Sequence, residues 1–384
     1  MKIVYFYPHF IHLAGTERIL IDKMNYLSAQ KGIEVFLVTH EQGDYPLAYP
    51  IAPTVKHIDL DVCTYTLYKH NIIIRFFRKR RCNVLLQTRF NNLMATIMPD
   101  VVIATTFYVN ILSLIDVCPV HFKKVLESHI DKCYIHCNDP VNRKNLKRWF
   151  RGILDMEYLN HRACRFDILV SLHQKDADDW SKYLKTTIIP NIVHLNSTGR
   201  YCNLSSKRVI FVGRYTIQKG IPELFQIWEK VFLKHPDWHL DMYGDGGLVD
   251  VPYTVAEQER INIHVHQPDY DIFSRYIESS IFVLTSVYEP FGLVIPEAMS
   301  CGLPVVSFDC PYGPASIITD GVDGFLIKNR SVNAFAEKIC QLMESRELRM
   351  AIGKAAILSS RKYSAERVMP QWISLFNELI KTSN

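Results

Sequence analysis

The stretch Ile281–Asp309 constrains the fold of this chain more than any other part of its sequence. Its residues read IFVLTSVYEPFGLVIPEAMSCGLPVVSFD, a pattern typical of a strand, a turn, a helix and a second strand. Pro290 and Gly292 interrupt the first apolar run. Pro296 suits a first helical turn, and Gly302 marks the end of the helix. We therefore expect an open α/β sheet, which binds its ligands at the carboxyl ends of its strands.

Two acidic residues flank this turn eight positions apart, Glu289 in the loop and Glu297 in the first helical turn. Backbone N–H groups near a helix start have no intrahelical partners and suit a phosphate, and here they belong to Gly292, Leu293 and Val294. A carboxylate beside them can accept two hydrogen bonds from a vicinal diol such as a ribose. The pattern therefore indicates a nucleotide near Glu297 and a second polyhydroxylated group near Glu289. The simpler alternative is that Glu297 only stabilises the positive end of its helix.

The run from Glu289 to Met299, EPFGLVIPEAM, resembles the E-x7-E signature of the retaining glycosyltransferases of family 4, and the following GLPVV extends the match. Members have the GT-B fold, an α/β architecture of two Rossmann-like domains facing a central cleft. The resemblance is to the type that makes bacterial cell-surface polysaccharides and glycolipids. It implies that Glu289 contacts the donor sugar in a catalytic role and that Glu297 holds the ribose hydroxyls. It also implies donor-binding residues in the turn, with amides that contact the diphosphate, namely Phe291, Gly292, Leu293 and Val294.

A second motif, GRYTIQKG at Gly213–Gly220, follows an apolar strand at Arg208–Val212. A strand that ends in a glycine turn places Arg214 and Lys219 at the same ligand-facing edge of the sheet. Two cations there would neutralise a diphosphate and offset the charge of the leaving group as the sugar departs. The G-R-x4-K-G spacing also resembles the phosphate-binding pair of the family. The alternative is an ordinary surface arginine and lysine.

The N-terminus is typical of a strand, a glycine turn, a helix and a second strand, the opening of a doubly wound sheet. Lys2–Tyr7 and Glu34–Thr39 are the predicted strands, and the helix follows Glu17. The dinucleotide fingerprint G-x-G-x-x-G is absent. The loop AGTER is similar to the first loop of the family, which implies that Gly15 and Thr16 bind the donor phosphate. Thr16 is also a candidate helix N-cap, and a plain turn glycine is the alternative at Gly15.

The strand Lys123–Leu126 is followed by the triplet E-S-H, which places His129 at the ligand-facing edge of the sheet. The triplet resembles the family's position for a histidine near the donor sugar, which implies a catalytic role for His129. A surface or core histidine is the alternative. An H-x3-C-x2-H-C cluster begins at the same residue and continues through Cys133, His136 and Cys137. It lacks the paired C-x2-C spacing of structural zinc sites, so we expect no metal.

Residues 64–98 carry apolar and aromatic side chains interleaved with basic ones, and we predict two helices, before and after about Cys82. A basic amphipathic segment can lie on an anionic bilayer surface. The basic residues of this predicted membrane or acceptor surface are Arg75, Arg78, Lys79, Arg80 and Arg81. Many members of the family act on lipid-linked acceptors, which supports this interpretation. A solvated helix face with its other side in the core is the alternative. No nucleic-acid-binding module accompanies the segment.

Length and composition fit two domains of a globular protein, because 384 residues exceed one ordinary domain and 48% of them are hydrophobic. We expect residues 1–195 to form the acceptor-side domain and residues 196–365 the nucleotide-sugar domain. Residues 366–384 would form a helix that crosses back to the first domain. The formal charge of +5 suits an anionic nucleotide or a loose association with an anionic membrane.

The sequence also predicts a location. No signal peptide is evident in MKIVYFYPHF, and no window reaches the roughly 18 uncharged apolar residues of a membrane span. The ten cysteines follow no repeating framework, so reduced thiols in a cytosol are expected. We therefore predict a cytoplasmic protein, with membrane association on the cytoplasmic face as a further prediction.

Together these features predict a retaining transferase that moves a hexosyl residue from a nucleotide diphosphate sugar, with UDP as the expected nucleotide. Its partners would be this donor and a glycan or lipid-linked acceptor, with no nucleic acid, cofactor or metal. A covalent intermediate on Glu289 and front-side departure and attack on one face are equally allowed. His266 stands where the family commonly has a glycine near the base-binding loop, which leaves the nucleotide open. The alternatives are a GT-B nucleotide-sugar epimerase and a catalytically inactive sugar-nucleotide-binding protein.

Overall fold

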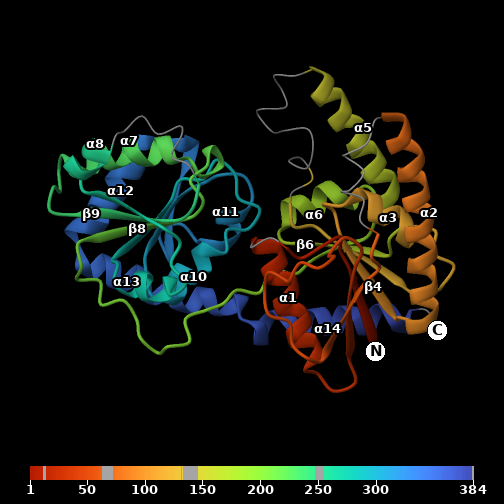
Figure 1. Ribbon diagram of the computed structural model, residues 1–384. Helices are drawn as coiled ribbons and strands as arrows, with labels where there is room; N and C mark the ends of the chain where they lie inside the picture. The colour runs from red at the N-terminus through yellow and green to blue at the C-terminus, as the bar shows by residue number, and fades with distance from the viewer. Residues whose placement is uncertain (12–13, 63–71, 131, 133–145, 247–254, 383–384) are drawn as a thin grey trace. The chain divides into compact units, whose positions relative to one another are not determined.

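Two parallel β-sheets organise the chain, one in each of two units (Figure 1). The structure is a computed structural model that describes residues 1–384 except 12–13, 63–71, 131, 133–145, 247–254 and 383–384. Unit 1 comprises Met1–Ile192 and Val368–Asn384, and unit 2 comprises Val193–Arg367. The last helix, α14 (Ala365–Lys381), begins in unit 2 and continues into unit 1.

Unit 1 is built on a seven-stranded sheet in the order β3-β2-β1-β4-β5-β6-β7, and every neighbouring pair is parallel. Its strands are β1 (Lys2–Phe6), β2 (Glu34–Thr39), β3 (Val55–Asp59), β4 (Val101–Thr105), β5 (Lys123–Glu127), β6 (Ile168–Ser171) and β7 (Thr186–Ile188). The central strands are buried on both faces, which is why they form continuous apolar runs such as VVIAT in β4.

Helices cover both faces of this sheet (Figure 1). One hydrophobic core joins alternate strand residues such as Val4 and Phe6 to four helices: α2 (Ile72–Ile97), α3 (Val109–Asp116), α5 (Leu146–Ala163) and α6 (Gln174–Ser181). The other face carries α1 (Gly15–Ser28) and the C-terminal helix α14, which meet where the Lys23 ammonium lies 3.4 Å from the Trp372 ring centroid.

Unit 2 is built on a six-stranded parallel sheet in the order β10-β9-β8-β11-β12-β13. Its strands are β8 (Arg208–Val212), β9 (His239–Tyr243), β10 (Ile263–His266), β11 (Ile281–Leu284), β12 (Val305–Phe308) and β13 (Gly324–Ile327). Counted within the unit, the order is 3-2-1-4-5-6, which is that of a Rossmann sheet. The predicted α/β class with two Rossmann-like domains is therefore confirmed.

The helices of unit 2 lie on both faces of its sheet: α7 and α12 pack together on one face, and α10 and α13 on the other (Figure 1). The helices are α7 (Ile221–Phe232), α8 (Val255–Arg260), α9 (Ile272–Ile277), α10 (Val294–Ser300), α11 (Gly313–Ile317), α12 (Val332–Glu344) and α13 (Arg346–Ser360). Residues 281–309 form β11, α10 and β12 with the turn between β11 and α10, as predicted. Gly302 ends α10 with a φ of +86°, a conformation that favours glycine.

Two local predictions were wrong. Residues 72–97 form one helix rather than two, because no glycine or proline interrupts them and the inward stripe of Leu86, Phe90 and Met94 continues past Cys82. Helix α1 begins at Gly15 with Ala14 as its N-cap, so Thr16 lies within the first turn and is not the cap. The strand β3 was not predicted, since its residues VKHID lack an apolar run.

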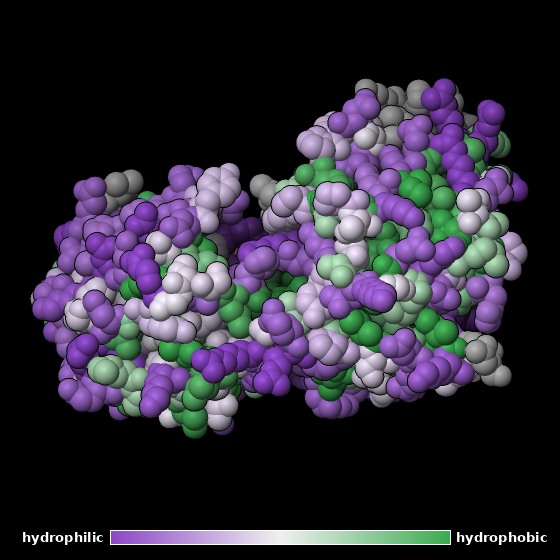
Figure 2. Space-filling model, turned by 90° about the horizontal axis from the view of Figure 1, so that it is seen from below, coloured by the Kyte–Doolittle hydropathy of each residue, from purple (hydrophilic) through white to green (hydrophobic). Residues whose placement is uncertain are grey.

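The surface drawn in Figure 2 is mainly hydrophilic, with hydrophobic side chains in small groups. Among the helices that the structure describes, none combines the length and apolar character needed to cross a bilayer.

Candidate functional site

The candidate site of unit 2 lies where the chain order of its sheet reverses. Strands β8 and β11 are neighbours there, although more than 60 residues separate them in the sequence. Ligands of open α/β sheets bind outside the carboxyl ends of the strands at such a point. The loop after β8 carries Arg214 and Lys219, and the loop after β11 carries Glu289. The topology therefore brings the two sequence motifs to one edge.

The centre of this edge is an ion pair between the Lys219 ammonium and the Glu289 carboxylate. Both side chains are largely buried, with 13% and 6% of their surfaces exposed. The Ser286 hydroxyl also donates to Glu289, at 2.8 Å. Both contacts fall on Oε1, and no hydrogen bond among the described residues uses Oε2 of Glu289. One carboxylate oxygen is thus held in place while the other can accept from a ligand.

Hydrogen bonds to backbone carbonyls connect the two loops. The Val287 N–H donates to the Gln218 carbonyl at 2.8 Å, and the Thr285 hydroxyl donates to the Lys219 carbonyl at 2.9 Å. Gly220, with a φ of +64°, allows this approach, because a Cβ there would lie 2.1 Å from the Thr285 carbonyl oxygen. The position of Glu289 therefore depends on the turn that ends β8.

Arg330 is a further part of this site that the sequence did not reveal. Its guanidinium donates to the carbonyls of Ser286 and Thr285 at 2.7 and 3.1 Å, and to Glu223 at 2.9 Å. It also lies 4.4 Å from the ring centroid of Phe308. Arg330 comes after β13 and has a φ of +47°, so no spacing rule connects it to the other site residues.

The turn before α10 presents free backbone donors. Gly292 has a φ of +87°, and the helix begins at Val294. Among the described residues, no hydrogen bond uses the N–H groups of Gly292, Leu293 or Val294. The Phe291 side chain is buried and packs edge-on against Tyr363, with centroids 5.4 Å apart, so only its backbone faces the turn.

Two charged groups complete the site of unit 2. Glu297 is 6% exposed in the first turn of α10, and its Oε2 lies 3.4 Å from the Tyr276 hydroxyl, which donates to it. The Arg214 side chain is exposed and forms no ion pair within the part of the chain that the structure describes. The site thus combines two paired cations, one exposed cation without an ion pair among the described residues, free amides and two buried carboxylates, a set that suits a phosphorylated, polyhydroxylated ligand.

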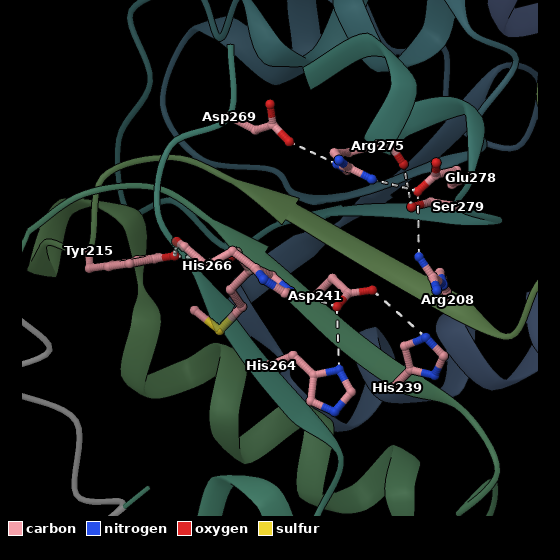
Figure 3. A network of polar contacts seen from close by, with 11 residues as sticks. Arg208, Tyr215, His239, Asp241, His264, His266, Asp269, Arg275, Glu278 and Ser279 are labelled. Atoms are coloured by element: carbon pink, nitrogen blue, oxygen red, sulfur yellow. Dashed lines mark hydrogen bonds and ion pairs between the residues drawn. The ribbon is translucent and has the colours of Figure 1, made fainter. Parts of the chain in front are cut away.

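His266 proves to belong to a polar network at the edge of the same sheet (Figure 3). Its Nε2 lies 2.9 Å from Asp241 Oδ1, and its ring stacks on Tyr243 at 4.5 Å. His264 and His239 face the same carboxylate at 3.4 and 3.8 Å. Among the described residues, no group of three or more histidine, cysteine or acidic side chains is arranged to hold a metal ion.

Unit 1 presents its own charged cluster at the carboxyl end of β5. His129 Nε2 lies 2.9 Å from Glu127 Oε2, and Lys23 Nζ lies 2.6 Å from Glu127 Oε1. All three side chains are almost fully buried. Burial alone would raise the pKa of Glu127, but Lys23 and His129 together hold that pKa below its usual value. Gly15, exposed, and Thr16, half-buried, lie in the first turn of α1 in the same unit.

The remaining predicted residues of unit 1 are placed in part. Arg78, Lys79, Arg80 and Arg81 are exposed on α2. Arg75 lies on the same helix, but its side chain is outside the described residues. Cys133, His136 and Cys137 of the zinc alternative also lie outside the described residues.

Comparison with known proteins identifies the class of the chain. Residues 202–359 match the family described as Glycosyl transferases group 1. An "Uncharacterized glycosyltransferase" of Haemophilus influenzae is 24% identical over 378 residues, which are 97% of this chain and 98% of that protein. The poly(ribitol-phosphate) alpha-N-acetylglucosaminyltransferase of Staphylococcus aureus is 32% identical over 192 residues, 49% of this chain and 39% of that protein. Residues 202–359 are therefore similar to a group 1 glycosyltransferase domain, and the predicted enzyme class, a glycosyltransferase, is confirmed.

Solved structures agree on the fold. The crystal structure of TarM superposes with a TM-score of 0.74 at 17% identity, over 98% of both chains. A mutant of S. aureus TarM in complex with fondaparinux, alpha-GlcNAc-glycerol and UDP gives 0.73 at 16% identity, over 98% of this chain and 99% of that one. The two Rossmann-like units thus have the GT-B architecture.

Replacing Arg330 by lysine should destabilise the loop that carries Glu289. One ammonium cannot reproduce three guanidinium hydrogen bonds, so buried carbonyls lose a donor, and the free energy of unfolding should fall by about 1–2 kcal/mol. Urea unfolding followed by tryptophan fluorescence measures the change. Arg361→Lys, at an exposed arginine of the same unit, is the control and should change stability little. Equal stabilities of the two variants would contradict the structural role of Arg330.

Proposed function

We propose that this glycosyltransferase moves a hexosyl residue from a nucleotide diphosphate sugar, with UDP as the nucleotide, to a glycan or lipid-linked acceptor, with retention at the anomeric carbon. The observation that carries the proposal is the Lys219–Glu289 pair at the strand-order reversal, with free amides at Gly292–Val294 beside it. At this edge, a cation and backbone N–H groups can bind the diphosphate of the nucleotide sugar. A carboxylate can bind the hydroxyls of its sugar.

Different site residues bind different parts of the donor. Arg214 and Lys219 neutralise the diphosphate and stabilise its charge as it leaves the sugar, together with the amides of the turn. Glu297, buried next to those amides, accepts from the two ribose hydroxyls. Glu289 accepts from sugar hydroxyls through Oε2, because Oε1 already binds Lys219 and Ser286. These two cations supply the charge that a metal provides elsewhere, so the proposal includes no divalent cation.

The residues of unit 1 complete the proposed assignment. Gly15 and Thr16 offer backbone N–H groups at the start of α1, where an anion is favoured. His129 positions the sugar or the acceptor through a ring that Glu127 holds in place. The proposal includes both front-side attack and a covalent intermediate on Glu289 as routes to retention.

The relatives support this choice of substrates. The S. aureus relative is named for transfer of N-acetylglucosamine to poly(ribitol-phosphate), and a solved neighbour was determined with UDP. Other relatives with shorter matches are named for amylovoran biosynthesis and for poly(glycerol-phosphate) glucosylation. These names support a polymer acceptor. The proposal also includes a donor on the cytoplasmic side and a lipid-linked acceptor.

Glu289→Ala and Glu297→Ala should separate the two halves of the donor site. Loss of Glu289 should lower kcat by about 100-fold or more while the Kd for UDP stays within about threefold, because its carboxylate faces the sugar. Loss of Glu297 should raise the Kd for UDP by about tenfold or more, since two hydrogen bonds to a charged acceptor disappear. Titration calorimetry with UDP, and nucleotide release from a panel of UDP- and GDP-sugars with and without lipid extract, measure these effects.

The same assays distinguish the alternatives. An epimerase would turn over the donor without an added acceptor, and a binding protein would retain UDP without any turnover. If both variants keep wild-type turnover and wild-type UDP affinity, the donor-site assignment is wrong. Glu347→Ala, at an exposed glutamate of α13, is the matched control and should leave both quantities unchanged.

We also propose that α2 binds an anionic membrane. The inward side chains of α2 pack in the core of unit 1. The outward side chains recur at helical spacing and line a hollow on the surface. The residues that line this hollow are Phe77, Arg80, Arg81, Val84, Leu85 and Thr88. Phe77 and Val84 are each 62% exposed, which is unusual for side chains of this size on a surface that otherwise carries charge. Apolar groups between arginines suit the boundary between lipid headgroups and acyl chains.

Replacing Arg78, Lys79, Arg80 and Arg81 by glutamine should weaken binding to vesicles that contain anionic lipid. Each basic residue near such a surface contributes about 1 kcal/mol, so the affinity should fall by about 100-fold or more, and salt should weaken the wild type most. Vesicle cosedimentation measures this with and without anionic lipid.

A control with the same charge change replaces Lys31, Arg200, Lys354 and Arg361 by glutamine, all at exposed positions outside α2. It should bind vesicles almost as the wild type does. Equal weakening by both sets of substitutions would show that net charge, rather than the α2 surface, governs the association. A Phe77→Ser and Val84→Ser variant should weaken binding further at high salt, where the apolar contribution dominates.

A further inference from the structure

A buried chain of three charged or titratable side chains links α1 to the proposed catalytic histidine. Lys23, Glu127 and His129 are joined by contacts of 2.6 and 2.9 Å, one on each oxygen of the glutamate. We infer that Lys23 and Glu127 are positioning residues that keep the proton of His129 on Nε2, so that Nδ1 accepts a hydrogen bond from a sugar hydroxyl. This inference rests on the proposed function and assigns roles to Lys23, which lies outside the motifs described above, and to Glu127, for which the E-S-H triplet specified no role.

The direction of the hydrogen bonds follows from charge. A lysine ammonium can only donate, and an ionised carboxylate can only accept. Glu127 is held in its ionised form, because the effects of Lys23 and His129 on its pKa outweigh the opposing effect of burial. The ring nitrogen that faces Glu127 must therefore carry a proton, and in a neutral imidazole the other nitrogen, Nδ1, has the free lone pair.

The free lone pair on Nδ1 indicates that this nitrogen binds a ligand. Nδ1 of His129 is buried and has no hydrogen-bond partner among the described residues. The hydroxyls of Thr105 and Thr106, at the end of the adjacent strand β4, are in the same situation. The Thr106 N–H donates to the Glu127 carbonyl at 3.0 Å, which places the ends of β4 and β5 side by side. Buried polar atoms are rarely left unsatisfied, so their occurrence at the ends of two neighbouring strands indicates a ligand rich in hydroxyl groups.

Lys23 is enclosed from three elements. Glu127 faces it from β5, the Tyr5 ring from β1 at 5.8 Å, and the Trp372 ring from α14 at 3.4 Å, and His129 lies beyond Glu127. Burial lowers the pKa of Lys23 to about 8, although Glu127 opposes the shift. As the pH rises through 8, Lys23 loses its charge and Glu127 loses its strongest partner. Activity should therefore decline on the alkaline side as the Lys23 ammonium loses its proton.

Glu127→Gln gives the sharpest test. The Lys23 ammonium can only donate, so the oxygen of the new amide must face Lys23 and accept its hydrogen bond. The amide nitrogen must then donate to Nε2 of His129, which moves the ring proton to Nδ1 and removes the acceptor. The double variant Lys23→Met/Glu127→Gln frees the amide to turn, so the oxygen can again accept from Nε2. We expect kcat/KM to fall by about 10- to 100-fold in the single variant, as for one lost buried hydrogen bond. The double variant should recover part of this loss.

Two readouts follow these variants in the full-length protein. Nitrogen-15 NMR of the histidine rings, assigned by comparison with His129→Asn, reports the tautomer without any substrate. It should show Nε2–H in the wild type, Nδ1–H in Glu127→Gln and mostly Nε2–H in the double variant. Kinetics with the UDP-sugar that the wild type turns over give kcat/KM from pH 6 to 10, and Lys23→Met should lack the alkaline decline near pH 8. Lys56→Met, which breaks an exposed lysine–glutamate pair, should change neither readout.

The outcomes separate this inference from the proposed function. Failure of the wild type to use any sugar nucleotide would reject the proposed function, while the tautomer measurement would still test the positioning role. An unchanged tautomer in Glu127→Gln, or a double variant that is worse than the single one, would overturn the inference. Thermal unfolding of each variant identifies losses that come only from stability.

Discussion

The buried ion pair between Lys219 and Glu289 is the interaction on which the candidate donor site depends. Removing two charges from water costs several kcal/mol each, and the pair offsets this only while both partners stay in place. Such a pair is weak evidence for stability, because apolar residues of similar volume would often stabilise the fold as well. Its position at the strand-order reversal, held by Ser286 and by the carbonyl contacts of Arg330, supports the ligand-binding role that we propose for it.

Each unit carries a buried lysine–glutamate pair at the carboxyl ends of its strands, but the two glutamates differ in how their oxygens are used. In unit 1, Lys23 and His129 bind separate oxygens of Glu127, so both oxygens have a partner. In unit 2, both partners of Glu289 bind Oε1. A carboxylate with a partner on each oxygen is suited to orient another side chain, whereas one with an oxygen free of partners is better suited to accept from a ligand. The same charge pair is therefore consistent with the proposed positioning role in one unit and the proposed sugar-binding role in the other.

The sequence predicted those parts of the molecule that depend on the type and spacing of neighbouring residues. The strand–turn–helix around Glu289 and the turn around Lys219 have strong spacing signals, and the parallel sheet explains why they meet. Arg330 was missed because it reaches the site from beyond the last strand. Its backbone has a positive φ, which the surrounding sequence does not predict. Lys23 was missed because a lysine in an amphipathic helix is expected at the surface. Its burial is explained only by partners about 100 and 350 residues away along the chain, Glu127 and Trp372.

The C-terminal helix shows how such distant contacts become part of a site. Helix α14 begins in unit 2, passes the unit boundary at Arg367 and Val368, and continues into unit 1 to place the Trp372 ring over Lys23. Pro370 lies just beyond that boundary and cannot donate to the carbonyl four residues earlier, so the helix lacks one backbone hydrogen bond close to the boundary. The aromatic ring provides an apolar wall that still attracts a cation, which lets Lys23 stay charged without another carboxylate. The charge state of the histidine cluster in unit 1 thus depends on a segment that sequence motifs alone would have assigned to packing.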